Sequence, residues 1–173
     1  MAGADVIILN GPMGVGKTTT ARALMDRLLP ALFLDGDYVS DFQPFDVRQP
    51  EHLDYIEDTL VHMVAFHAAN GFQRQIVAGV FETPERLANF DARLRSQGHD
   101  VTCFRLTCES REHERRVRGR NRENLHWELQ RHRELTRVLN EGAARGFLGH
   151  RVDTTGRSAE DVAEHIAGEL RRP

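Results

Sequence analysis

Lysine is nearly absent from this chain, because Lys17 is the only lysine among 23 lysine and arginine residues. With no second lysine, the chain cannot contain the N/T-K-x-D motif through which GTPases recognise guanine. The sequence uses arginine wherever a generic cation is sufficient, and the two side chains are not interchangeable where a compact charge is needed. The single lysine therefore marks a position with a special requirement.

Long apolar runs and cysteines are also scarce. No stretch approaches the ~18 consecutive apolar residues of a membrane span, and the first apolar run, Val6–Leu9, is too short for the core of a signal peptide. These absences predict a cytoplasmic protein without a membrane partner. Cys103 and Cys108 lie five positions apart on a predicted strand, so they point to opposite faces and cannot form a local disulfide.

Length, composition and charge further limit the class of protein to which the chain can belong. The chain has 173 residues, of which 40% are hydrophobic and 28% charged. This is the composition of an ordinary globular protein, so we expect a single domain over residues 1–173. The formal net charge of −3 argues against a dedicated nucleic-acid binder.

The single lysine lies in a glycine-rich motif. Residues 11–18 read Gly-Pro-Met-Gly-Val-Gly-Lys-Thr and match the phosphate-loop pattern G-x-x-x-x-G-K-[ST]. A compact ammonium can reach between β- and γ-phosphate oxygens, where a planar guanidinium does not fit. The apolar run before the motif predicts a buried strand, and the residues after it predict a helix, so free backbone N–H groups and the helix dipole would point at the phosphates. The predicted nucleotide-binding residues of the loop are Gly11, Met13, Gly14, Val15, Gly16, Lys17, Thr18 and Thr19, with Thr18 offering its hydroxyl to Mg²⁺.

The rest of the chain alternates predicted strands with predicted helices. Strands are expected at 31–34, 76–81, 101–106 and 147–152, and helices follow most of them. The last helix is expected to be capped by Ser158, with Asp161 at its third position. Such alternation implies right-handed crossovers and a mainly parallel sheet covered on both faces. The predicted fold class is therefore α/β, a three-layer α/β/α arrangement of the P-loop NTPase type.

Two acids follow the second predicted strand. The third strand ends without an acid, so the usual second carboxylate of a P-loop ATPase is missing there, whereas Asp35 and Asp37 close the second strand. Ligands of open α/β sheets lie beyond the carboxyl ends of the strands. In an extended chain, residues two apart project the same way. We expect one carboxylate to hold the Mg²⁺ shell and the other to accept a proton from an attacking hydroxyl; the alternative is a turn whose side chains bond only local backbone.

Charge is unevenly distributed along the chain. Between Asp35 and Asp58 there are eight acids against Arg48 alone, and between Arg111 and Arg122 there are six arginines against two acids. One interpretation is two solvated faces. The other is a protein that holds a metal-bound polyphosphate on one side and covers it with arginines, which would stabilise the charge of phosphoryl transfer and exclude water. Arg116, Arg120 and Arg122 cannot share one helical face, which favours a bend at Gly119.

The phosphate loop, Leu34-Asp35-Gly36-Asp37 and the arginine run 116–122 together resemble the small-molecule kinases related to shikimate kinase and gluconate kinase. Within that group the chain looks most like the phosphotransferases grouped with chloramphenicol phosphotransferase and the tunicamycin-resistance protein. The resemblance implies a five-stranded parallel sheet of order 2-3-1-4-5 and an arginine-bearing lid at about residues 109–125. The chain departs from the shikimate kinase pattern at the end of the third strand, where Ala78-Gly79-Val80-Phe81-Glu82 replaces a glycine triplet.

The resemblance also implies a role for individual residues. Asp35 would be the metal-side acid with Thr18, and Asp37 the acid that contacts the acceptor hydroxyl, with Glu82 as the other candidate base. Lys17, Asp37, Arg120 and Arg122 would form the catalytic set. Arg116 would be a further lid arginine, and Thr154, Thr155 and Gly156 would form the loop that touches adenine.

The function predicted from these features is transfer of the γ-phosphate of ATP, with Mg²⁺, to a hydroxyl of a small metabolite or antibiotic. The expected partner is this small-molecule acceptor, and the chain is expected to be a monomer or a homodimer. Tyr38, Phe42, Phe45, Asp46 and Arg48 would crowd the acceptor pocket or pack a loop against the core. The alternatives are a nucleoside or nucleotide kinase, and an ATP-binding sequestration or regulatory protein that transfers no phosphate.

Overall fold

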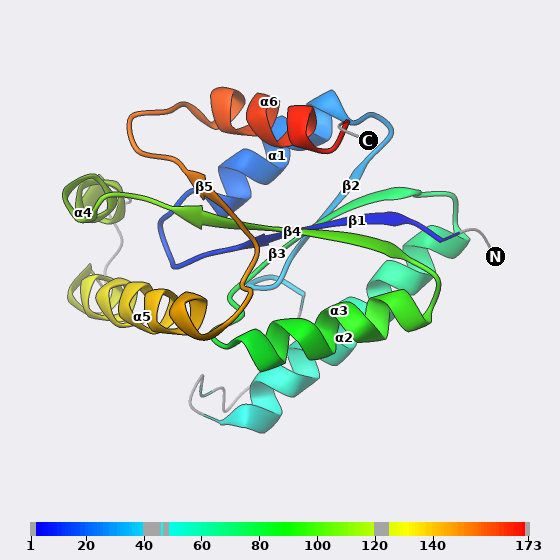
Figure 1. Cartoon of the computed structure of the whole chain (residues 1–173), viewed down its shortest axis with the longest axis horizontal. Coiled ribbons are helices and arrows are strands. Elements are labelled where there is room, and N and C mark those ends of the chain that lie inside the picture. Colours follow the sequence, from blue (N-terminus) through cyan, green and yellow to red (C-terminus); the bar gives the residue numbers. More distant parts are fainter. Residues whose placement is uncertain (1–2, 40–45, 47–48, 120–124, 172–173) are drawn as a thin grey trace.

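The computed structural model describes residues 3–39, 46, 49–119 and 125–171. Within these ranges it contains a sheet of parallel strands and the helices that connect them, as Figure 1 shows. The strands are β1 (Asp5–Asn10), β2 (Leu32–Asp35), β3 (Arg74–Gly79), β4 (Asp100–Thr107) and β5 (His150–Asp153). The helices are α1 (Lys17–Arg27), α2 (Pro50–Ala69), α3 (Pro84–Ser96), α4 (Ser110–Gly119), α5 (Leu125–Arg145) and α6 (Ala159–Glu169).

The sheet has the order β2-β3-β1-β4-β5, and all of its pairings are parallel. The predicted three-layer α/β fold and strand order are confirmed. Helices α1 and α6 cover one face of the sheet, and α2, α3 and α5 cover the other (Figure 1). Because β1 is central and its neighbours run parallel to it, the loop after β1 opens at the edge where all the strands end.

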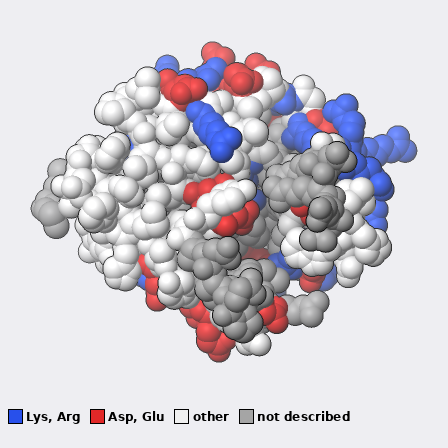
Figure 2. Space-filling view, turned by 180° about the vertical axis from the view of Figure 1, so that it is seen from behind, with Lys and Arg blue, Asp and Glu red and all other residues white. Residues whose placement is uncertain are grey.

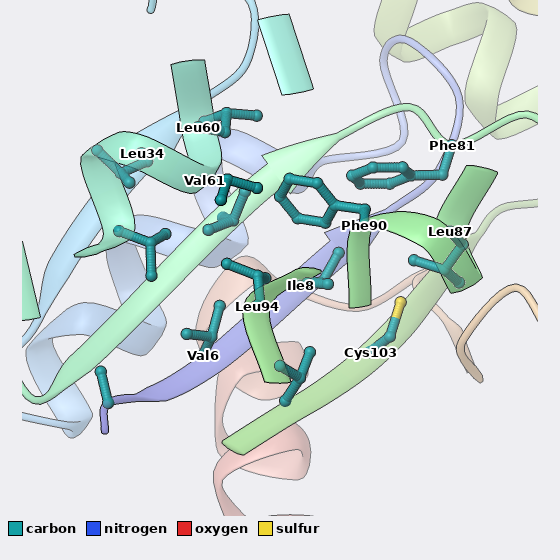
Figure 3. Close-up of a cluster of buried hydrophobic side chains, with 14 of the residues drawn as sticks. Val6, Ile8, Leu34, Leu60, Val61, Phe81, Leu87, Phe90, Leu94 and Cys103 are labelled. Carbon is teal, nitrogen blue, oxygen red and sulfur yellow. The ribbon is translucent and has the colours of Figure 1, made fainter. Parts of the chain in front are cut away.

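Apolar side chains of the sheet alternate between two cores. Val6 and Ile8 of β1 belong to the core under α2, α3 and α5, whereas Ile7 and Leu9 belong to the core under α1 and α6. Figure 3 shows the first core, in which the rings of Phe81 and Phe90 lie against each other with centroids 4.9 Å apart. Because β1 is buried on both faces, its sequence is one continuous apolar run. The same burial holds in place the end of β1, from which the phosphate loop starts.

Two strands are shifted from their predicted positions. The third strand was expected at 76–81, but β3 ends at Gly79, and the backbone N–H and carbonyl of Phe81 bond to the buried Asn10 side chain at 3.0 and 3.2 Å. The ladder stops there because its partner β1 ends at Asn10. The fifth strand was expected at 147–152, but β5 begins at His150 because Gly149 adopts a φ of 107°, which breaks the extended chain before it.

The last helix begins as predicted. The Ser158 side chain accepts a hydrogen bond from the Asp161 N–H, and the Asp161 carboxylate accepts one from the Ser158 N–H. This capping box orients the segment between β5 and α6, which carries the predicted adenine loop. Among the helices of the described residues, none is both long enough and apolar enough to span a membrane.

Candidate nucleotide site

The phosphate loop occupies residues 11–16, between β1 and α1, at the carboxyl edge of the sheet. Gly14 and Gly16 adopt φ values of 80° and 108°, a region that side chains other than glycine rarely adopt. A Cβ atom on Gly14 would lie 2.6 Å from Cγ2 of Val117, so α4 packs directly on the loop. The glycines of the motif are thus required by backbone conformation and by the close approach of α4.

The first turn of α1 is arranged to bind an anion. Its N-cap is Gly16, and within the described chain no side chain caps this turn and no acid lies in it. The Lys17 ammonium folds back over the loop and donates to the carbonyls of Gly11 at 2.8 Å and Pro12 at 3.2 Å. Backbone N–H groups, the positive end of the helix dipole and the ammonium are therefore concentrated at one place.

Thr18 and Asp35 meet across the mouth of the sheet. The Thr18 hydroxyl, in the first turn of α1, donates to Oδ2 of Asp35, the last residue of β2, at 2.8 Å. The sequence predicted both residues as metal ligands, 17 positions apart, and the structure brings them together. A hydroxyl and a carboxylate are oxygen donors of the kind that Mg²⁺ prefers, so the donor set fits this ion.

Asp37 is placed differently from the expectation. The prediction that Asp35 and Asp37 project from one extended strand is wrong, because β2 ends at Asp35 and the chain turns back. The turn is closed by a hydrogen bond of 3.0 Å from the Tyr38 N–H to the Asp35 carbonyl, and Gly36 donates to the Ala78 carbonyl at 2.9 Å. Asp37 stays beside Asp35 because its own N–H donates to Oδ1 of Asp35 at 3.2 Å, and its side chain is exposed.

Glu82 is already engaged by a cation. Its Oε1 atom accepts a hydrogen bond of 2.7 Å from the Arg131 guanidinium of α5, and both side chains are largely covered. A carboxylate oxygen that already accepts from a guanidinium is less accessible to the hydroxyl of a substrate. Between the two candidate bases, the surroundings favour Asp37.

A pocket of about 300 Å³ lies beside the phosphate loop. It is lined by residues of the loop and α1, by Arg116 of α4 and by the segment from 154 to 162. Thr154 is almost fully buried, and its hydroxyl lies 3.3 Å from the Val15 carbonyl and 3.0 Å from the Thr107 carbonyl. The predicted adenine loop is therefore anchored to the phosphate loop at Thr154. The hydroxyl of Thr155 instead accepts from the Glu109 N–H and donates to Asp153.

Arg116 connects three segments around this pocket. Its guanidinium donates to the Val15 carbonyl at 3.3 Å, to the Thr154 carbonyl at 2.8 Å and to the Glu112 carboxylate. The other Glu112 oxygen accepts from the Gly156 N–H at 2.8 Å, and this hydrogen bond is the main reason why the pKa of Glu112 is lowered. Arg116 was predicted as a lid arginine at the nucleotide, and the structure places it in the pocket wall, held by Glu112.

The other predicted lid arginines, Arg120 and Arg122, lie outside the described residues, as do Phe42, Phe45 and Arg48 of the expected acceptor pocket. The described part of the arginine segment is α4, which carries Arg111, Arg115, Arg116 and Arg118. Figure 2 shows positive side chains gathered on the side of the molecule where α4 lies. Several acids of the region 35–58 are paired with α3, since Arg86 contacts Asp54 and Glu57, and Arg93 contacts Asp58.

His113 is a residue that the sequence did not single out. It is buried on α4, and its Nε2–H donates to the carbonyl of Met13 in the phosphate loop. Burial lowers the pKa of His113 to about 4, and the buried ring of His132 on α5 packs against it with centroids 4.3 Å apart. A neutral imidazole thus holds α4 on the loop. One histidine in an arginine-rich helix carries no sequence pattern that could have revealed this contact.

Comparisons with known proteins agree with this geometry. The sequence matches the family described as the AAA domain over residues 7–135, which includes the phosphate loop, Asp35 and α4. No curated protein sequence is significantly similar to the chain.

Many solved structures are similar to this chain, and three of them illustrate the shared fold over nearly its whole length. The tunicamycin resistance protein of Deinococcus radiodurans is 24% identical with a TM-score of 0.68, and the alignment covers 98% of this chain and 97% of that one. A gluconokinase from Sinorhizobium meliloti 1021 is 14% identical, with a TM-score of 0.67 and coverage of 98% and 97%. The APS kinase of Mycobacterium tuberculosis, solved with AMPPNP and APS, is 15% identical, with a TM-score of 0.63 and coverage of 99% and 100%. The predicted resemblance to P-loop small-molecule kinases is confirmed.

Proposed function

The chain belongs to the AAA domain family, and on that premise we propose that it is an ATP- and Mg²⁺-dependent phosphotransferase acting on a hydroxyl of a small molecule. The observation that carries this proposal is the contact of 2.8 Å between Thr18 and Asp35 beside the phosphate loop. A loop that binds phosphate alone needs no carboxylate from another strand, whereas a site for a metal-bound nucleotide, the donor in phosphoryl transfer, does.

The binding role belongs to the loop and its neighbours. The N–H groups of residues 13–19 would cradle the phosphates, and the Lys17 ammonium would exchange its carbonyl partners for β- and γ-phosphate oxygens. Thr18 and Asp35 would hold Mg²⁺, which when bound neutralises charge on the phosphates. Arg116 and Thr154, which line the pocket, would form the wall against the base and ribose, and we assign Thr155 and Gly156 to the same loop.

The transfer role falls to Asp37. Its backbone N–H is bonded to Asp35 and its side chain is exposed, so its carboxylate would accept the proton of an acceptor hydroxyl as the hydroxyl oxygen attacks the γ-phosphorus and ADP leaves. We assign Arg120 and Arg122 to the charge that develops on the transferring phosphoryl group, as expected from the sequence. The segment at about 109–125 would act as the lid, and α4 is its described part.

The fold of two neighbours supports the substrate class. One is called a gluconokinase and one was solved with an ATP analogue, and both share this sheet and its connections. We propose that residues 1–173 form one such kinase domain, located in the cytoplasm, with a small hydroxyl-bearing acceptor as its partner. The acceptor would enter near Asp37, on the β2 side of the loop.

The proposal is tested by a transfer screen with ATP labelled in the γ-phosphate, across sugars, hydroxy acids, nucleosides and antibiotics. We expect label to appear in at least one acceptor with the wild-type protein and Mg²⁺, and to disappear with Lys17→Ala. Arg137→Ala, which removes an exposed arginine of α5 paired with Glu141, is the matched control and should transfer at the wild-type rate. Tight ATP binding without transfer to any acceptor would instead support an ATP-binding regulatory protein.

A further inference from the structure

A second pocket lies on the other side of the phosphate loop. It measures about 280 Å³ and lies between the ends of β4 and β5, helix α5 and the inner side of α4. Pro12 of the phosphate loop and His113 form its inner end, and it shares no lining residue with the nucleotide pocket. The polar side chains around it are Arg105, Arg151, Thr107, Thr136 and Asn140.

Two of these side chains are arginines in direct register. Arg105 of β4 and Arg151 of β5 are partners in the parallel ladder, so their side chains leave the same face of the sheet as neighbours. Like charges at paired positions destabilise a sheet. Such a pair is stable only where nearby groups, solvent or a bound anion compensate the repulsion.

The chain itself compensates this pair incompletely. Arg105 is partly buried and donates to Oδ1 of Asn140 at 3.2 Å, and no carboxylate of the described chain lies within ion-pair distance of it. Arg151 lies 3.8 Å from Oδ2 of Asp153, a long contact at the exposed rim. Burial and the neighbouring Arg151 both lower the pKa of Arg105, so its charged form lacks stabilisation.

We propose that this pocket is a second anion site, which binds a dianionic tetrahedral oxyanion, namely a phosphate group, between Arg105 and Arg151. Guanidinium groups offer paired N–H donors that match phosphate oxygens. The Asn140 amide can donate as well, because its oxygen already accepts from Arg105. The pocket is larger than one phosphate ion needs, so it can take inorganic phosphate or the phosphate of a small monoester.

The site is separate from the proposed catalytic chemistry but touches the same loop. Pro12, which lines the anion pocket, accepts a hydrogen bond from Lys17 through its carbonyl. His113 also lines the pocket and donates to the Met13 carbonyl. An anion bound here would therefore share a pocket with a residue of the phosphate loop and with the histidine that bonds to this loop.

The test is calorimetric titration of the full chain with inorganic phosphate while saturating Mg²⁺ and AMPPNP fill the nucleotide pocket. We expect one binding event, and affinity reduced about tenfold or more in Arg105→Gln and in Arg151→Gln through loss of a charge-assisted contact. Arg137→Gln, an exposed α5 arginine paired with Glu141, should bind as the wild type does. Arg151 is exposed, so its variant retains a folded protein for the test if Arg105→Gln does not fold.

A parallel titration with glycerol 3-phosphate distinguishes the two sources of the phosphate group. Tighter binding than that of inorganic phosphate, with the same dependence on Arg151, would identify a monoester site. Malonate, a planar dicarboxylate, should bind more weakly than either. The proposal is overturned if neither phosphate compound binds the AMPPNP-saturated protein, or if binding is unchanged in both arginine variants.

Discussion

At the scale of single residues, the strongest constraint on function is the distance between Thr18 and Asp35. These side chains belong to different elements and approach to 2.8 Å only because β2 ends opposite the first turn of α1. We propose that this hydroxyl and carboxylate, placed beside a phosphate loop, hold the metal of a nucleotide.

The variant Asp35→Asn tests this use. The amide keeps the shape and an oxygen that can accept from Thr18, but it loses the negative charge that attracts a divalent cation. We expect the Mg²⁺ concentration that gives half-maximal nucleotide binding to rise ~10-fold or more, as for other losses in a metal site. The measurement is a Mg²⁺ titration of ATP binding, with the exposed Asp26→Asn as control. An unchanged midpoint would exclude Asp35 from the metal site.

At the scale of elements, α4 is held between the phosphate loop and the segment after β5. His113 and Val117 contact the loop, and Arg116 with Glu112 contacts Thr154 and Gly156. Each of these contacts joins residues that lie at least 38 positions apart in the sequence. The helix thus acts as a wall shared by the loop and the nucleotide pocket.

Glu112→Gln should loosen that wall. The glutamine nitrogen cannot accept a hydrogen bond, so either Arg116 or the Gly156 N–H loses its partner. A loss of ~1 kcal/mol per hydrogen bond predicts ATP affinity about 5-fold weaker. Glu114→Gln, which breaks only the pair with Arg133 on the outer side of α4, should leave affinity unchanged in the same calorimetric titration. Equal affinities in the two variants would show that Arg116 does not need Glu112.

How far the elements could be predicted depends on the kind of signal. A continuous apolar run identified β1, and the lysine-bearing motif located the turn between β1 and α1, because local pattern fixes buried strands and glycine turns. The end of β3 could not be predicted, because it depends on where β1 stops and on the side chain of Asn10. The turn at Gly36 was only the alternative to an extended chain in the sequence-based prediction, because the hydrogen bond that supports it goes to Ala78 on another strand.

At the scale of the whole molecule, the sheet order places several of the described candidate groups at one edge. The loop after β1, Asp35 after β2, Glu82 after β3 and Thr154 after β5 all follow carboxyl ends of parallel strands. The alternation of strands and helices along the sequence predicted a parallel sheet with its ligand site at this edge. It could not predict which groups meet there, because the contacts of His113 and Arg116 arise only from the position of α4 over the loop.

The burial of His113 predicts a pH dependence of stability. Its pKa is lowered to about 4 in the folded protein, whereas an exposed imidazole titrates near ~6.5. Between these values the unfolded chain binds more protons, so stability is complete above about pH 6.5 and falls as the pH decreases toward 4. His113→Gln should remove about 2 kcal/mol of the fall between pH 7 and pH 5, measured by urea unfolding at these two pH values. The exposed His165→Gln should retain it, and an unaltered fall in His113→Gln would contradict the assignment.

The central claim, that this chain transfers phosphate rather than only binding ATP, is tested most directly at Asp37. Asp37→Asn keeps the shape of the side chain and removes its basicity, while Asp35, Thr18 and the phosphate loop stay intact. The measurement is the rate of transfer from labelled ATP to an acceptor found in the screen, together with Mg·ATP affinity. We expect a rate lower by ~10²- to 10⁴-fold, as is typical for loss of a general base, with affinity changed by no more than a few-fold. Transfer at the wild-type rate would contradict it.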